Sequence, residues 1–369
     1  MYLYDIIFNT LEEEILNHEY EFGAMLPSEN QLCKRFSVER TTVRKALSML
    51  ADKKYVEKCP GIGSRVIYRK PAPAAAGEQR GAAIGFFIME SAQSNKKITE
   101  PYYADLFYYL DKECAAHDMQ LIYTAISEIS DIAELISKHD FIAAVFVTRT
   151  PEHLICAARK TGIPILTVND DHAFVPCIQH DYLNGSYSAL RYLYDMGHRH
   201  IALLSGPMGF LATDDKMTGC YRAMHKFGLE IPPERILCGR DWTFQSGYEL
   251  TQSLLAQPGP KPTALFVFND IMAVGAIRAI HDAGLQIPDD ISVVGFDNME
   301  QLQFTEPDLT TVDGNTAYLA KVIVDTAFKN AFDQYDMGVK FVIPTKLVVR
   351  GTVRRIGDTV PEAPAPCAT

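Results

Sequence analysis

The hydrophobic and polar positions of residues 27–50 predict two short helices joined by a tight turn. Ser28 and Gln31 form a capping-box pattern that begins the first helix, and Ser37 and Val38 form the turn. The apolar positions recur on one face of each helix: Leu32 and Phe36 in the first, then Val43, Leu47 and Leu50 in the second.

The opposite face of the second helix is cationic and rich in hydroxyl groups. It carries Arg40, Thr41, Arg44, Lys45 and Ser48. A helix-turn-helix with such a face suits a DNA major groove, where arginine can bond guanine edges bidentately. An ordinary helical hairpin with a solvated basic face has the same spacing, so the spacing alone leaves both interpretations open.

The segments on either side favour DNA binding. A helix is predicted over residues 4–17, with Ile7, Leu11 and Ile15 on its apolar face. Two short strands, residues 55–58 and 65–68, enclose a glycine-rich turn. Strands around such a turn are typical of a winged hairpin.

Residues 4–68 resemble the GntR-type winged-helix regulators. The resemblance rests on LPSE at 26–29, TTVR at 41–44, Ala46, Leu47 and Leu50, and the glycines of the wing. It implies an operator-binding surface made of Ser28, Asn30, Lys34, Arg40, Thr41, Thr42, Arg44, Lys45, Gly61, Gly63 and Arg65. Glu39 stands where the family usually has a small hydroxyl residue, and Asn30 where an arginine is frequent, so the operator sequence stays open.

From residue 83 onward, short apolar runs alternate with amphipathic helical patterns. Strands are predicted at 83–89, 120–124, 142–148, 164–168, 201–205, 235–238, 264–268, 291–296 and 340–350. Helices are predicted at 102–117, 131–138, 152–161, 182–196, 215–227, 244–256, 271–283 and 316–334. This alternation predicts parallel sheets with helices on both faces, in a series too long for one six-stranded sheet. We therefore predict an α/β domain of two doubly wound lobes with a ligand cleft, behind a small α+β winged helix-turn-helix domain.

The domain boundaries follow from composition. Residues 1–69 form the predicted DNA-binding domain, and residues 70–82, rich in Pro, Ala and Gly, a linker. Residues 83–354 form the two-lobed domain, and the Pro/Ala-rich residues 355–369 are expected to be a disordered tail.

Charge is distributed unevenly along the 369 residues, whose formal net charge is −11. Residues 31–70 carry eleven Lys or Arg and three acidic residues, whereas residues 1–30 carry seven acidic residues and no Lys or Arg. The positive charge therefore gathers on the predicted recognition helix and wing. The acidic remainder disfavours non-specific adhesion to DNA elsewhere on the surface.

The eight cysteines are scattered without a CxxC pair, so we expect reduced, mostly apolar cysteines and neither a disulfide framework nor a zinc site. No signal-peptide pattern opens the chain and no apolar run reaches the length of a membrane span. A cytoplasmic location is expected. His198 and His200 have metal-like spacing but no companion ligands, so a polar turn is the favoured interpretation.

The remaining chemistry suggests binding rather than catalysis. The sequence contains no GxSxG, GxxxxGK[ST] or HExxH motif. Asn269 and Asp297 follow predicted strands, and Trp242, the single tryptophan, precedes a helix. An aromatic ring with amide and carboxylate groups suits a polyol, which presents a C–H face and vicinal hydroxyls. Helix capping explains Asn269 and Asp297 about as well, and core packing is the commoner role of a lone tryptophan.

Residues 83–354 resemble the effector domain of the LacI/GalR repressors, which is similar to periplasmic sugar-binding proteins. The motifs are MGHRHIA at 196–202, SGP at 205–207, FNDIMA at 268–273 and IPDDISVVGFD at 287–297. The resemblance implies that Trp242 stacks on the effector and that Asn269 and Asp297 bond it. Lys216 stands where the family usually has an arginine, and Tyr102 and Asp170 are further candidates at strand-to-helix turns.

The two resemblances together match the arrangement of arabinose-repressor-like regulators. They imply a homodimeric DNA-binding regulator, expected to be a repressor, that binds operator DNA and whose operator affinity a small sugar changes, with a pentose such as arabinose favoured. No cofactor and no enzymatic activity are expected. The alternatives are a purine or nucleoside effector, a sugar-processing enzyme with a DNA-binding head, and a periplasmic-type binding protein with a basic N-terminus.

Overall fold

The computed structural model describes residues 3–16, 20, 24–53, 55–59, 63–66, 82–90, 97–147, 149–173, 175–300, 305–328 and 338–357. The chain divides into two compact units, Met1–Arg80 and Gly81–Thr369. Most of the predicted linker and of the predicted tail lies outside the described residues.

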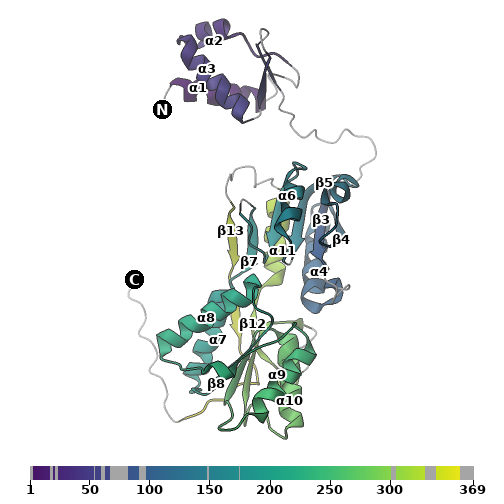
Figure 1. The fold of residues 1–369 in the computed structure, drawn as a ribbon, viewed down its shortest axis with the longest axis vertical. Coiled ribbons are helices and arrows are strands. Elements are labelled where there is room, and N and C mark those ends of the chain that lie inside the picture. Colours follow the sequence, from purple (N-terminus) through teal and green to yellow (C-terminus); the bar gives the residue numbers. More distant parts are fainter. Residues whose placement is uncertain are drawn as a thin grey trace. The chain divides into compact units, whose positions relative to one another are not determined.

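The described residues of the N-terminal unit form three helices and a two-stranded hairpin (Figure 1). Its elements are α1 (Leu3–Leu16), α2 (Glu29–Phe36), α3 (Arg40–Asp52), β1 (Val56–Cys59) and β2 (Gly63–Val66). The strands pair antiparallel. Apolar residues from every element close one small core, in which Leu11, Leu32, Val43 and Leu50 are fully buried.

Local sequence fixes the junctions of the helix-turn-helix. The capping box is present, because the Ser28 hydroxyl accepts from Gln31 N–H while the Gln31 side chain accepts from Ser28 N–H. At the end of α2, Ser37 adopts a left-handed backbone with φ of 53°. This residue reverses the chain so that α3 begins three residues later.

The second unit contains two six-stranded sheets, in the strand orders β13-β7-β6-β5-β3-β4 and β14-β12-β11-β10-β8-β9. We call the lobes around them the first lobe and the second lobe. The first-lobe strands are β3 (Ala83–Met89), β4 (Gln120–Ile126), β5 (Phe141–Val147), β6 (Ile165–Val168), β7 (Cys177–His180) and β13 (Lys340–Ile343). The second-lobe strands are β8 (Ile201–Ser205), β9 (Ile236–Cys238), β10 (Ala264–Val267), β11 (Ser292–Asp297), β12 (Thr310–Asp313) and β14 (Lys346–Val348).

Helices cover both faces of each sheet, because alternate strand residues point to opposite sides. In the first lobe, α4 (Pro101–Ala116) and α11 (Thr316–Phe328) pack on one face, and α5 (Ile132–Ser137) and α6 (Glu152–Arg159) on the other. In the second lobe, α7 (Tyr182–Asp195) and α8 (Leu211–Phe227) pack opposite α9 (Phe244–Ala256) and α10 (Asp270–Asp282). Short 3-10 turns, η1 (Lys97–Thr99) and η2 (Pro233–Arg235), complete the helices. The predicted doubly wound lobes are confirmed.

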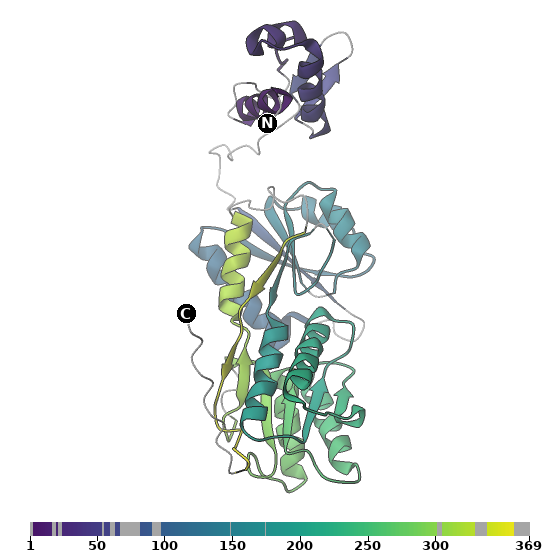
Figure 2. The ribbon, with the colours of Figure 1, turned by 90° about the vertical axis from the view of Figure 1, so that its left-hand side faces the viewer.

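The chain passes between the lobes three times, as Figure 2 shows for the last passage, between β13 and β14. The other passages lead from β7 into α7 and from β12 into α11. Each lobe is therefore discontinuous in sequence, and three crossovers connect the two lobes.

Four sequence expectations are corrected. The single strand expected at 340–350 is two strands in different sheets, since Pro344 has no N–H to continue a ladder. Strands β7 and β12 were not predicted, because CIQH and TTVD read as polar, although they lie in the sheets. Helix α8 begins at Leu211, before the expected Asp215, so Asp214 and Asp215 lie inside its first turns.

No helix in the described ranges has both the length and the apolar character needed to cross a membrane.

Candidate DNA-binding surface and effector site

The recognition face of α3 is organised by one carboxylate from α2. Glu29 accepts from Arg44 Nε at 3.1 Å on both carboxylate oxygens, and it also accepts from Arg40 Nε. The hydrogen bond from Arg40 lowers the pKa of Glu29, so the carboxylate stays charged. Both arginine side chains remain about 60% exposed. Glu29 therefore sets the spacing of two guanidinium groups that face solvent on the helix expected to enter the groove.

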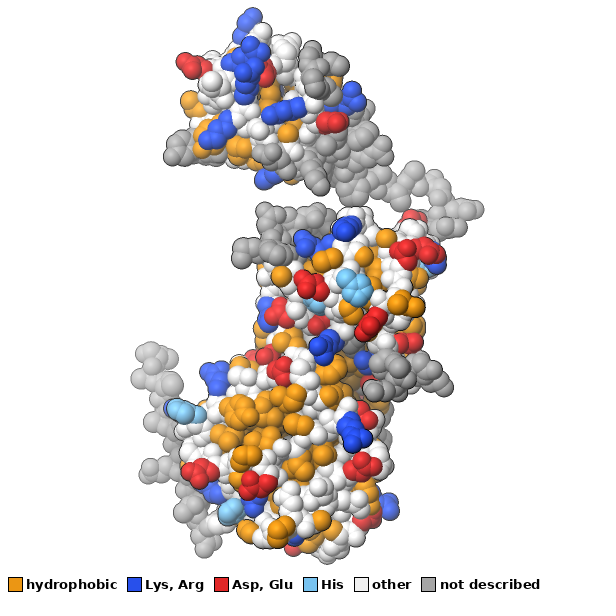
Figure 3. Space-filling model, viewed as in Figure 1, with side chains coloured by type: hydrophobic (Ala, Val, Ile, Leu, Met, Phe, Trp, Pro, Cys, Tyr) orange, Lys and Arg blue, Asp and Glu red, His pale blue; other side chains and the backbone are white. Residues whose placement is uncertain are grey.

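The other predicted DNA contacts fall on the same unit. Ser28, Asn30, Lys34, Thr41, Lys45, Gly63 and Arg65 are exposed, and Thr42 is half-buried. Lys45 Nζ lies 3.6 Å from the centroid of the Tyr4 ring on α1. Gly61 lies outside the described residues. Figure 3 shows several lysine and arginine side chains on the face of this unit that it presents, with few acidic ones among them.

The effector residues expected in the second lobe gather where β8, β10 and β11 end. Trp242 lies against Gly206, which follows β8, so closely that a Cβ on Gly206 would lie 2.5 Å from three ring atoms. The indole is half-buried and packs against the apolar residues on both faces of the sheet. Glycine at position 206 is therefore what allows the ring to lie flat over the end of the strand.

Asn269, which lies between β10 and α10, is engaged within the protein. Its Oδ1 accepts from Met272 N–H at 2.9 Å and caps α10, and its Nδ2 donates to the Trp242 carbonyl oxygen at 3.1 Å. The helix-capping interpretation is therefore present in the structure, together with a link to the tryptophan. A direct bond from Asn269 to an effector stays a prediction.

Lys216, on α8, is an ammonium enclosed by aromatic rings. It is 3% exposed, and its Nζ donates to the Phe268 carbonyl oxygen at 2.7 Å. The distances from Nζ to the ring centroids are 3.9 Å for Phe296, 4.9 Å for Tyr182 and 5.7 Å for Trp242. Burial lowers the pKa of Lys216, and the charge of Asp297 opposes this shift. A positive charge at this depth depends on the nearby carboxylates and rings.

Asp297 ends β11 with a backbone φ of 109°, a conformation that residues with side chains rarely adopt. Such strained positions gather at functional sites. Burial raises the pKa of its carboxyl to about 6, and Lys216 acts in the opposite direction. Asp297 and Lys216 thus influence each other's pKa, although no ion pair closer than 4.0 Å joins them.

Asp270 is a second buried carboxyl beside this pair. Its Oδ1 accepts from Thr311 Oγ1 at 2.6 Å and its Oδ2 from Met299 N–H at 3.0 Å. Burial, followed by the charge of Asp297, raises its pKa to about 7. These bonds tie α10 to β12 and to the loop after β11, so Asp270 holds the site's frame together.

Tyr102, at the start of α4 in the first lobe, belongs to a hydrogen-bonded chain. His180 Nδ1 lies 2.6 Å from the Gly314 carbonyl oxygen, which can only accept, so Nδ1 carries the proton and Nε2 accepts from Tyr102 OH at 3.0 Å. The Tyr102 oxygen in turn accepts from Asn169 Nδ2 at 2.6 Å. Burial lowers the pKa of His180 to about 4, which keeps the ring neutral and this direction fixed.

The Tyr102 chain joins two of the crossovers, because His180 ends β7 and Gly314 follows β12. This chain also faces the second lobe, since Tyr182 is a side-chain hydrogen-bond partner of Tyr102 and the charge of Asp297 helps to raise the pKa of Tyr102. No motif or spacing singles out His180 or Tyr182 in the sequence. Their place depends on crossovers that no local pattern reveals.

Asp170 follows β6 and is half-buried. One of its oxygens, Oδ2, accepts from Thr150 N–H at 2.7 Å and lies 2.9 Å from His172 Nε2. That hydrogen bond raises the pKa of His172. The structure thus shows Asp170 fixing two neighbouring turns of the first lobe, and its role toward an effector stays a prediction.

The MGHRHIA motif packs against residues 354–356. His198 is buried, with Nδ1 3.0 Å from Thr263 Oγ1 and Nε2 3.1 Å from the Arg354 carbonyl oxygen. Gly197 lies against the carbonyl oxygen of Ile356, where a Cβ would be only 1.9 Å away. No cluster of three metal-ligating side chains occurs within the described ranges.

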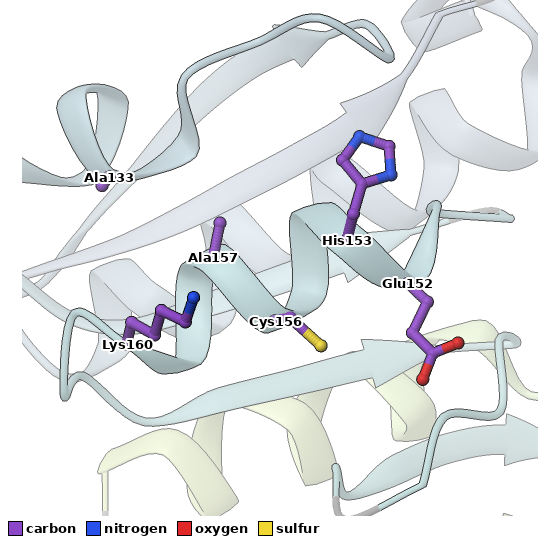
Figure 4. A pocket seen from close by; sticks show the side chains of 6 residues that line it. All are labelled: Ala133, Glu152, His153, Cys156, Ala157 and Lys160. Carbon is purple, nitrogen blue, oxygen red and sulfur yellow. The ribbon is translucent and has the colours of Figure 1, made fainter.

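A surface depression lies apart from these residues, between α5 and α6 (Figure 4). Its lining comes from Ala133, Glu152, His153, Cys156, Ala157 and Lys160. None of the predicted effector residues contributes to it.

Comparison with known proteins agrees with this architecture. Residues 3–66 match the gntR family of bacterial regulatory proteins, and residues 190–353 match the periplasmic binding protein-like domain. The transcriptional repressor PurR of Pasteurella multocida is 29% identical over 262 residues, 69% of this chain and 78% of that protein. The probable transcriptional repressor ExuR of Bacillus subtilis is 26% identical over 332 residues, 88% of this chain and 98% of that protein.

Solved structures share the fold of the second unit. A LacI family regulator from Enterococcus faecium with bound ribose has a TM-score of 0.64 and 21% identity, covering 74% of this chain and all of that one. The lac repressor dimer bound to operator and an anti-inducer has a TM-score of 0.65 and 23% identity, covering 75% and 95%.

The chain therefore joins a GntR-type helix-turn-helix domain to a periplasmic-binding-protein-like domain with the two-lobed fold of the LacI regulators. It is a DNA-binding transcriptional repressor with a small-molecule effector domain, and its relatives are repressors rather than enzymes.

Proposed function

We propose that this repressor responds to a sugar, with a pentose such as arabinose favoured, held where the strands of the second lobe end. The observation that carries the proposal is the cluster of Trp242, Lys216 and Asp297 at the ends of β8, β10 and β11. An indole face packs on the C–H face of a sugar ring, while an ammonium and a carboxylate exchange hydrogen bonds with its hydroxyls. The structural neighbour that holds ribose supports a sugar as the effector class.

The DNA side of the proposal rests on Arg40 and Arg44, which present guanidinium groups to solvent from α3. We propose that two copies of the chain bind a pseudo-palindromic operator, with one winged head on each half-site. The effector domains supply the dimer contact, as the dimeric lac repressor neighbour suggests.

The coupling follows from the three crossovers. An effector that bonds both the second lobe and the hydrogen-bonded chain of Tyr102 and His180 changes the angle between the lobes. In a dimer this changes the separation or freedom of the two heads. Thermodynamic reciprocity then requires operator DNA to weaken effector binding by the same factor by which effector weakens operator binding.

A purine or nucleoside is the second candidate. The flat indole of Trp242, supported from below by Gly206, can stack on a planar base as well as on a sugar.

The experiment uses the full-length chain. Genomic fragments that it retains are selected and sequenced, and the retained complex is then challenged with pentoses, hexoses and nucleosides. Release of a defined palindromic fragment by a pentose supports the proposal. Release by a nucleoside alone selects the second candidate, and a retained fragment that no compound releases contradicts a sugar effector.

A further inference from the structure

The effector site holds ionisable groups of both signs, and this restricts the effector's own charge. The described residues place one ammonium, Lys216, and two carboxyl groups, Asp297 and Asp270, at the ends of the second-lobe strands. Lys216 and Asp270 are 3% and 2% exposed, so water does little to screen them.

Each of these groups has a limited capacity for a ligand. Asp270 accepts from Thr311 and Met299 and serves the protein frame. Lys216 gives one of its hydrogens to the Phe268 carbonyl oxygen, which leaves two donors. Within the part of the chain that the structure describes, no group hydrogen-bonds to the Asp297 side chain, and as a carboxylate it can only accept.

A ligand group that bonds both Lys216 and Asp297 must therefore both accept and donate. A hydroxyl meets this requirement, since it accepts from the ammonium and donates to the carboxylate. A ligand carboxylate or phosphate only accepts, so it would face Asp297 without a proton between them. Burying like charges side by side in a poorly screened site is strongly unfavourable.

Among the described residues, the hydrogen-bonded chain of Tyr102 and His180 on the facing edge of the first lobe adds no positive charge. His180 is neutral, with both nitrogens committed to Gly314 and Tyr102. Tyr102 keeps its proton, because burial raises its pKa. Arg149 approaches Gly209 in the loop between β8 and α8, but its side chain is exposed and its charge is screened by water.

We propose that the effector is an uncharged, hydroxyl-bearing molecule, and that the opposed Lys216 and Asp297 exclude sugar acids and sugar phosphates. The proposal rests on the sugar-binding function and narrows it to one charge class. Lysine suits this role because it supplies a point charge to one oxygen, whereas the fork of an arginine matches a carboxylate.

The test compares matched ligands that differ in charge. The affinity of the full chain is measured at pH 7.5 for galactose and galacturonate, glucose and glucuronate, ribose and ribose 5-phosphate, and arabinose and arabinose 5-phosphate. In each pair with measurable binding, the neutral sugar should bind at least about tenfold more tightly than its charged counterpart. A charged sugar that binds more tightly than its neutral partner overturns the charge rule while leaving a sugar-responsive repressor intact. Operator binding that persists while no sugar of either kind binds overturns the proposed function and the charge rule with it.

A variant locates the cause of the exclusion. Asp297→Asn replaces the carboxylate by an amide of the same shape that can donate to an anion, so it should reduce the preference for neutral sugars at least about tenfold. Asp282→Asn, at an exposed carboxylate at the end of α10, is the matched control and should leave the preference unchanged. An unchanged preference in Asp297→Asn would show that this carboxylate does not exclude anions.

Discussion

The Trp242 ring lies directly on the backbone of Gly206, so that the end of β8 serves as the floor beneath the indole. The contact leaves no room for a side chain at position 206. Since the ring is also half-buried between two apolar clusters, its orientation is set by the fold and not by a ligand.

Gly206→Ala should therefore tilt the indole and weaken effector binding. The added methyl group must displace the ring, and such overpacking costs about 1–3 kcal/mol. Titration of tryptophan fluorescence with the effector reports the affinity, and operator binding by the same variant is the internal control. Wild-type effector affinity in a folded Gly206→Ala protein would mean that the ring does not contact the effector.

Asn269 has two separable tasks, and two substitutions separate them. Asn269→Ser keeps an oxygen to cap α10 but removes the donor to the Trp242 carbonyl, whereas Asn269→Ala removes both. Thermal unfolding should show the alanine variant less stable than the serine variant by about 1 kcal/mol, the value of an N-cap. Effector affinity should fall similarly in both. Equal stability of the two variants would show that the cap contributes nothing.

Arg44 should contribute directly to operator affinity. Arg44→Ala is expected to cost about 1–3 kcal/mol of operator binding if the guanidinium reads a base. Arg222→Ala, at an exposed arginine on α8, is the matched control and should bind operator normally. Electrophoretic mobility shifts at constant salt measure both. Unchanged binding by Arg44→Ala would remove this residue from the DNA interface.

Asp270 should make stability depend on pH. Its pKa is raised from 3.8 to about 7, so between these values the folded protein holds a proton that the unfolded chain has released. Stability from this group is therefore greatest at low pH and falls as pH rises toward 7, by at most about 1.4 kcal/mol per pH unit.

Denaturant unfolding at pH 5, 6, 7 and 8 tests this linkage by comparing wild type with Asp270→Asn. The wild type should gain stability relative to the variant as pH falls below 7. A difference that stays constant across the series would show that Asp270 titrates normally in the folded state.

The fold was largely predictable from the sequence where strands are apolar and helices amphipathic. Strand β3 carries the run AIGFFIM and was predicted at its observed bounds. Strands β7 and β12 were not predicted because Gln179, His180 and the threonines of β12 are polar. These side chains become buried only in the assembled sheets. The split of residues 340–350 likewise follows from pairing with two sheets, which a local pattern does not contain.

The candidate site was predictable in part for the same physical reason. Trp242, Asn269 and Asp297 stand next to strands whose ends are visible in the sequence, and the structure brings them together. His180 could not be found this way, because its partner Gly314 is 134 residues distant and on a different crossover. The hydrogen bonds of the Asn269 side chain with Met272 and Trp242 also depend on packing between elements.

The central claim, that effector and operator binding are coupled through the lobes, is tested most directly by one titration. The effector is titrated into the full-length chain, with the fluorescence of Trp242 as signal, in the absence and presence of saturating operator DNA. Coupling of this kind is typically about 5- to 150-fold, so the effector should bind more weakly to the operator complex by a factor in that range. The same affinity in both titrations would contradict the account.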